Sequence, residues 1–254
     1  MNPRIAIFAM TAMLIAATPV GSNPTGDTAK EPDHQALVNK IKKKLKARSE
    51  KYPGAYSKRD VQERVYDPDN GELESSRDFL IEVWDFRGKR PATKFLSCKI
   101  NGEVVDPEDC RQEQQSEPPH DVFGDDADEH YRIEYGGTAE WREQSVHALE
   151  IVPLENTQRH AKGKLYFDRD DLDLVGMDIT IADYPFGLED LSIQMGFKKT
   201  EEGTVLDDGV TKLQVYVPLF MHNDIVTKFT ASDQRLLKKD ERPSLPGDDS
   251  AAAS

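Results

Sequence analysis

The chain has 254 residues, of which 47 are acidic and 33 are basic, and its formal net charge is −14 at pH 7. Such a chain repels phosphate backbones, which argues against nucleic-acid binding. No apolar stretch reaches the roughly 20 residues that a membrane-spanning helix needs, so we do not expect a transmembrane protein.

The N-terminus predicts export. Arg4 precedes an apolar or small run from Ile5 to Ala17, which is the pattern of a secretory signal peptide. We expect residues 1–22 to be removed and the mature protein to be soluble in the periplasm. Because no cysteine follows the apolar run, no acyl anchor is expected.

Composition divides the rest of the chain into three parts. Residues 23–33 predict a linker and residues 238–254 a disordered tail, because both lack apolar residues to bury. The stretch between them, 34–237, has the length of one domain.

The domain begins with a predicted helix that carries the basic stretch 39–51, NKIKKKLKARSEK. Asp33 is placed to cap it, and Leu37, Ile41 and Leu45 step by four along one face. The lysines lie opposite. This pattern fits a helix that packs on the body of the protein, and it also fits contact with anionic lipid headgroups.

Cys98 and Cys110 are the two cysteines of the chain. In an exported protein they favour a disulfide, and the Asn101-Gly102 hairpin signal between them would bring them together. A catalytic pair is the alternative, but thiol-redox centres use the Cys-x-x-Cys spacing.

Alternating apolar residues predict strands over most of the remaining chain. Residues 58–86 predict a hairpin whose turn lies at 66–73. Further strands are predicted at 94–100, 129–135, 145–153, 163–167, 175–181 and 191–197.

The last apolar run, 213–231, stays in one phase and predicts one long strand. Pro218 within it indicates a sheet edge or a bulge. Residues 116–129 predict a surface loop, and the Gly-Gly in 135–141 predicts a turn. Ten or so antiparallel strands after one helix predict a mainly β (α+β) fold, a curved sheet or half-open β-barrel with the N-terminal helix packed on it.

Four aspartates, Asp168, Asp170, Asp171 and Asp173, lie in one short stretch and suggest a calcium loop. Counted from Asp168 or from Asp171, hydrophobic residues occupy the fifth and twelfth positions, where that loop needs oxygen ligands. A turn between two strands, with aspartates bonding the turn backbone, fits better.

Other catalytic signals are weak. No nucleophile elbow or phosphate-binding glycine loop occurs, and we expect neither an enzyme nor a cofactor or metal site. No metal-binding spacing joins the six histidines, which we interpret as strand or loop residues: His34, His120, His130, His147, His160 and His222.

If the protein were an enzyme, the first place to search would be the group of carboxylates and an imidazole in the predicted loop. A solvated acidic loop explains this group equally well. Its members are Asp125, Asp126, Asp128, Glu129 and His130.

The stretch KLYFDRDDLDLVGMDI (164–179), in an exported chain with an N-terminal amphipathic helix and successive antiparallel strands, resembles the periplasmic outer-membrane lipoprotein-sorting (LolA/LolB-like) superfamily. The similarity spans about 34–237 in element order. It implies a half-open barrel lidded by helices that binds acyl chains or acts as an envelope sensor. The candidate lid helices are 186–191 and 106–115.

Two functions follow. The first is a lipid or lipoprotein carrier, in which apolar burial supplies the binding energy. The alternative is an envelope scaffold or sensor that binds another protein through its acidic surface, an edge near Pro218 or the loop 116–129. In the first case the residues expected to line the lipid surface are Phe167, Ile193, Met195, Phe197, Val215 and Val217.

Overall fold

The computed structural model describes residues 34–86, 91–111, 120–124, 126–218, 220–238 and 241. The predicted signal peptide and linker lie outside these residues, as does the predicted tail except for residues 238 and 241.

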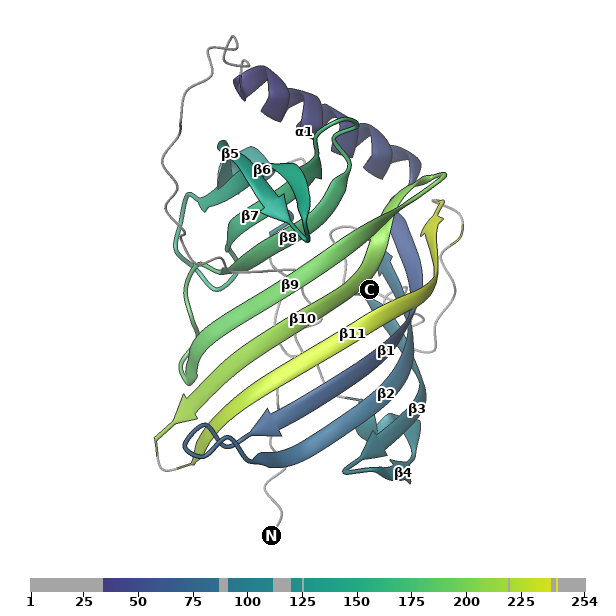
Figure 1. Ribbon diagram of the computed structural model, residues 1–254, viewed down its shortest axis with the longest axis vertical. Helices are drawn as coiled ribbons and strands as arrows, with labels where there is room; N and C mark the ends of the chain where they lie inside the picture. Colours follow the sequence, from purple (N-terminus) through teal and green to yellow (C-terminus); the bar gives the residue numbers. More distant parts are fainter. Residues whose placement is uncertain are drawn as a thin grey trace, which may run out of the picture.

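The described residues form one antiparallel sheet that does not close, with one long helix packed across it (Figure 1). The predicted fold class is confirmed. In chain order the elements are α1 (His34–Lys51), β1 (Gly54–Tyr66), β2 (Leu73–Phe86), β3 (Ala92–Ile100), β4 (Glu103–Val105), the 3-10 turn η1 (Pro107–Cys110), α2 (Ala127–His130), β5 (Tyr131–Trp141), β6 (Gln144–Pro153), β7 (Ala161–Asp168), β8 (Leu174–Ile181), β9 (Leu188–Thr200), β10 (Gly203–Val217) and β11 (Met221–Leu237).

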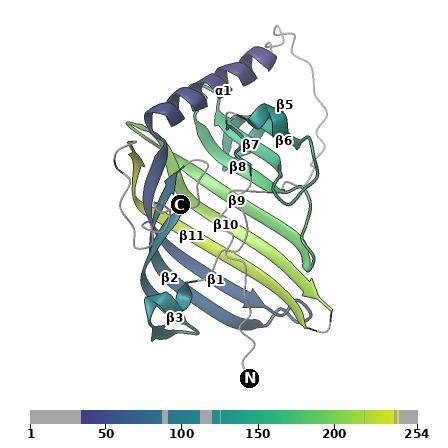
Figure 2. The ribbon, with the colours of Figure 1, turned by 180° about the vertical axis from the view of Figure 1, so that it is seen from behind.

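The strand order is β4-β3-β2-β1-β11-β10-β9-β8-β7-β6-β5. The first and last strands of the chain therefore pair in the middle of the sheet, and β4 and β5 are its two edges. The connection from β4 to β5, residues 106–130, must pass from one edge to the other. We call this connection the strap. Figure 2 shows the same sheet from behind.

The helix defines the inner face of the sheet. Of the predicted helix face, Ile41 is buried in the main core and Leu37 and Leu45 pack against it half-buried. Val38, which was not predicted, is buried there as well, together with Val65 of β1. Because successive residues of a strand point to opposite faces, Val61 and Glu63 lie on the same inner face as Val65. The predicted cap Asp33 lies outside the described residues.

The strap also lies on the inner face at both of its ends. At its start, Cys110 of η1 is joined to Cys98 of β3, which confirms the predicted disulfide. The turn Asn101-Gly102 has positive φ values of 51° and 84° and closes the β3–β4 hairpin, as expected for this pair of residues. Near its end, Val122 and Phe123 pack against the main core.

The prediction of one strand over 213–231 is wrong. β10 and β11 are two strands that pair with each other from Val217 and Met221 onward, and Pro218 lies in the turn between them. Proline fits a turn because it lacks the N–H that a sheet ladder needs. Both strands are central, so there is no sheet edge at Pro218.

The predicted turn at 135–141 is also wrong. These residues continue β5 through a bulge between Tyr135 and Gly137, and the φ of Gly137 is +96°. The chain turns later, at Arg142 and Glu143, where φ is 48° and 67°.

The candidate lid helices are not helices of that kind. Residues 186–191 lead into β9, and the described part of 106–115 forms only the single turn η1. The described helix that packs on the inner face of the sheet is α1. No described helix is long and apolar enough to span a membrane.

Candidate functional site

A second apolar cluster lies on the inner face of β1, β2, β3 and β11. Val61, Ile81 and Val83 are buried at its base. Three half-buried phenylalanines surround them, Phe79, Phe95 and Phe229. The rings of Phe79 and Phe95 lie 5.6 Å apart. This part of the inner face therefore keeps accessible aromatic surface.

One cation is buried beside this cluster. The guanidinium of Arg59 lies 5.4 Å from the ring centre of Phe229, and its Nε donates to Ser57 Oγ at 2.9 Å. Burial lowers the pKa of Arg59, and Asp85 partly offsets this. Burial raises the pKa of the Asp85 carboxyl; Arg59 opposes this rise and Asp121 of the strap adds to it. The strap thus comes within electrostatic reach of β2.

The six residues expected to line a lipid surface have two kinds of surroundings. Phe167, Ile193 and Met195 are buried in the main core. Phe197 and Val215 are half-buried against its margin, and Val217 is half-buried at the end of β10. Contact of any of the six with a ligand stays a prediction.

The aspartate-rich stretch is a turn between β7 and β8. Asp168 Oδ1 accepts from the backbone nitrogens of Asp170 and Asp171 at 2.8 and 3.1 Å. Asp171 Oδ1 accepts from the nitrogen of Asp173 at 2.8 Å. Leu172 completes the turn with a φ of +61°. The aspartates hold the turn backbone, as predicted.

Lysines from two other elements form ion pairs with two of the aspartates in this turn. Lys44 of α1 lies 2.7 Å from Asp173, and Lys199 of β9 pairs with Asp171. The hydrogen bond from Lys199 lowers the pKa of the Asp171 carboxyl. These ion pairs fasten α1 to the sheet and occupy the oxygens that a metal ion would need.

A polar pocket of about 280 Å³ lies beside the turn, at the tip of the β5–β6 hairpin. Trp141 stacks on Tyr166 at 4.7 Å and covers Gly176, where an added Cβ would lie 2.1 Å from the indole. Arg142 reaches over to Asp208, with one contact of 3.0 Å. The pocket is lined by Trp141, Arg142, Gln144, Asp168, Asp171, Asp173, Val175, Phe197, Lys199 and Thr204.

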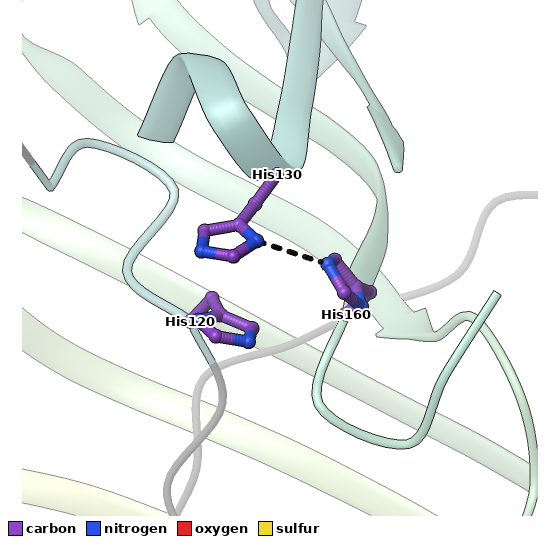
Figure 3. A group of neighbouring side chains, drawn as sticks. All are labelled: His120, His130 and His160. Atoms are coloured by element: carbon purple, nitrogen blue, oxygen red, sulfur yellow. Dashed lines mark hydrogen bonds between the residues drawn. The ribbon is translucent and has the colours of Figure 1, made fainter. Parts of the chain in front are cut away.

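Three histidines from separate segments meet at the far end of the strap (Figure 3). His120 and His130 both lie in the strap, His130 at the end of α2, and His160 precedes β7. One ring nitrogen of each lies within 4.8 Å of the others. Burial and the neighbouring His130 lower the pKa of both His120 and His160. Both effects favour the neutral form of these two rings.

Backbone hydrogen bonds hold this histidine cluster in place. The nitrogen of His120 donates to Arg159 O at 3.0 Å, and Tyr131 Oη donates to His120 O at 3.1 Å. Tyr131 Oη also accepts from the nitrogen of Ala161 at 3.1 Å. One buried tyrosine therefore joins the strap to β7.

The sequence did not predict this cluster. His120 and His130 are 10 residues apart, His130 and His160 are 30 residues apart, and these separations match no metal-binding motif. The acidic group proposed as a first place to search is only partly brought together. Asp126 lies 3.6 Å from His130, whereas Asp128 pairs with Lys42 at 2.6 Å. Asp125 lies outside the described residues.

No protein-family model and no curated protein sequence matches this chain. Solved structures do match. They include an outer membrane lipoprotein-sorting protein domain from Vibrio parahaemolyticus (13% identical, TM-score 0.44, covering 83% of this chain and 94% of that one). They also include a DUF1329 family protein from Desulfovibrio piger (12%, 0.42, 84% and 95%) and a LolA superfamily protein from Nitrosomonas europaea (12%, 0.33, 82% and 94%).

The matched structures include proteins of the superfamily that the sequence resembles, and their TM-scores lie below 0.5.

Proposed function

We propose that this protein is an exported, non-enzymatic binding protein, a carrier-like module that takes up an acyl chain of a lipid or lipoprotein on the inner face of its sheet. The disulfide supports an oxidising compartment outside the cytoplasm. The open sheet supports a binding role, because within the described residues its two edge strands, β4 and β5, do not pair with each other and the sheet does not close on itself.

The observation that carries the proposal is the group of half-buried phenylalanines Phe79, Phe95 and Phe229. They lie on the inner face, next to buried aliphatic residues, and not on the outer surface. Apolar surface removed from water contributes about 25 cal/mol per Å². An acyl chain laid along these rings would bury their remaining exposed area.

The two described ends of the strap lie on the same inner face as the phenylalanines. Its start is tied to β3 by the disulfide, and Val122 and Phe123 near its end pack against the main core. Phe197, Val215 and Val217 are the members of the predicted lining that keep some exposure, so we assign them as further contacts of the acyl chain.

The test compares two neighbouring residues of β2. Phe79 and Leu80 are both half-buried, but they point to opposite faces. We expect non-reducing native mass spectrometry to find a co-purified acyl compound. After its removal, Phe79→Ser should bind a pyrene-labelled phosphatidylethanolamine several-fold more weakly, while Leu80→Ser binds as the wild type does. A clean apoprotein that takes up no added lipid would contradict the proposal, as would equal losses in both variants.

A protein partner is the second candidate, and the free edge of the sheet favours it. Within the described residues β5 pairs only with β6, so it presents 11 residues of backbone to a further strand. A partner found by in vivo crosslinking from β5, and lost when Thr138→Pro removes a backbone N–H from the free side of this strand, would support this candidate. Crosslinks confined to other surfaces would count against it.

A further inference from the structure

We propose that His120, His130 and His160 bind a transition metal ion of the Zn²⁺ type, and that this ion fastens the strap to the connection between β6 and β7. Two of the ligands, His120 and His130, come from the C-terminal end of the strap, and His160 comes from the connection between β6 and β7. An ion held by all of them therefore crosslinks these segments, independently of whether an acyl chain is bound.

Two of the ligand atoms already have the separation that a tetrahedral ion requires. Zinc–nitrogen bonds of about 2.0–2.1 Å place neighbouring ligand nitrogens about 3.3 Å apart. His130 Nδ1 and His160 Nε2 are 3.4 Å apart. In Figure 3 these two nitrogens face each other. In the metal-free chain one of them donates to the other, and an ion would take the place of that proton.

The outer nitrogens of the same two rings face oxygen atoms. His130 Nε2 lies 3.6 Å from an oxygen of Asp126, and His160 Nδ1 lies 2.6 Å from Thr157 Oγ1. Metal-binding histidines commonly donate their second N–H to such a partner, which fixes the tautomer. The Thr157 hydroxyl can accept a hydrogen bond from His160 Nδ1 or donate one to it, so this contact is compatible with either tautomer of His160.

His120 needs only a side-chain rotation. Its ring stacks on that of His130 with 3.6 Å between ring centres, while its backbone is held on both sides, by Arg159 O and by Tyr131 Oη. One nitrogen of this ring lies within 4.8 Å of the ligand nitrogens of His130 and His160, and an ion would draw it closer. The partial exposure of His120 and His130 leaves a fourth position for water.

The ligand types select the ion. Three imidazoles suit zinc, copper, nickel or iron, whereas calcium and magnesium require oxygen ligands. The carboxylate of Asp126 is placed beside His130 as an outer partner.

The test uses the full mature chain after treatment with a chelator. We expect calorimetry with ZnCl₂ to show one ion per chain, and Co²⁺ to give the visible absorption of a tetrahedral nitrogen site. His120→Ala and His130→Ala should each weaken Zn²⁺ binding at least tenfold. His222→Ala is the matched control, because His222 also lies beside a carboxylate, 3.8 Å from Asp69, and it should bind Zn²⁺ unchanged.

Hydrogen exchange tests the crosslink itself. Zn²⁺ should slow amide exchange in residues 120–130 and around His160 in the wild type, and should not do so in His120→Ala. The proposal is overturned if the wild type binds no Zn²⁺, if His222→Ala weakens binding as much as the cluster variants, or if bound Zn²⁺ leaves exchange in the strap unaltered.

Discussion

Asp178 of β8 offers a sharp test of the sheet's outer face. Its side chain is only 6% exposed and lies near Tyr166 and Lys164 of β7 and Gln194 of β9. Burial raises the pKa of its carboxyl from 3.8 to about 6, against the hydrogen bonds and the lysine that lower it. We predict that Asp178→Asn stabilises the protein at neutral pH.

The sign follows from proton binding. The folded state holds the Asp178 proton more tightly than the unfolded state, so stability is greatest below about pH 4 and falls as the pH rises through 4 to 6. At about 1.4 kcal/mol per pKa unit, the loss above pH 6 is about 2 to 3 kcal/mol. Asparagine keeps the size of the side chain and removes the charge, so it should recover most of this.

The measurement is urea unfolding of the wild type and Asp178→Asn between pH 4 and pH 8. The difference in the free energy of unfolding should be near zero at pH 4 and approach about 2 kcal/mol at pH 7.5. Asp60, exposed on β1, supplies the control variant Asp60→Asn, which should show no such trend. A difference that stays constant with pH, or a destabilised asparagine variant at pH 7.5, would refute the reasoning.

Three further predictions concern stability. Replacing Cys98 and Cys110, 12 residues apart, with serine should lower the free energy of unfolding by about 3 kcal/mol; an unfolding midpoint that a reductant leaves unaltered would contradict this. Gly176→Ala should displace the indole of Trp141, cost about 1 to 3 kcal/mol and shift tryptophan emission to the red; unaltered emission would count against the close contact. Arg77→Ala should cost about 3 kcal/mol in urea unfolding because it leaves the buried Glu63 without its ion-pair partner; Arg77→Met with Glu63→Gln should recover much of that loss, and a double variant no better than Arg77→Ala would argue that packing dominates.

The alternation of apolar residues and the turn-forming residues were sufficient to predict many local features of the fold. The hairpin of β1 and β2, the Asn101-Gly102 turn, the disulfide and the aspartate turn are all present as the sequence predicts. Each depends on residues close together in the chain, where turn preference and alternation act directly. The same reasoning failed at Pro218 and at Gly137. A proline or a glycine interrupts the alternation of a strand in the same way in a turn, at a sheet edge or at a bulge, so the sequence does not tell these cases apart.

The amino-acid sequence by itself determined the acidic, mainly β character of the chain, its strands and the apolar face of its helix. Only the tertiary structure decided that β1 pairs with β11, that the strap joins the two sheet edges, and that His120, His130 and His160 meet. The physical reason is range. Strand and turn preferences depend on neighbouring residues, whereas strand pairing and the histidine cluster depend on packing between segments that are distant in the chain.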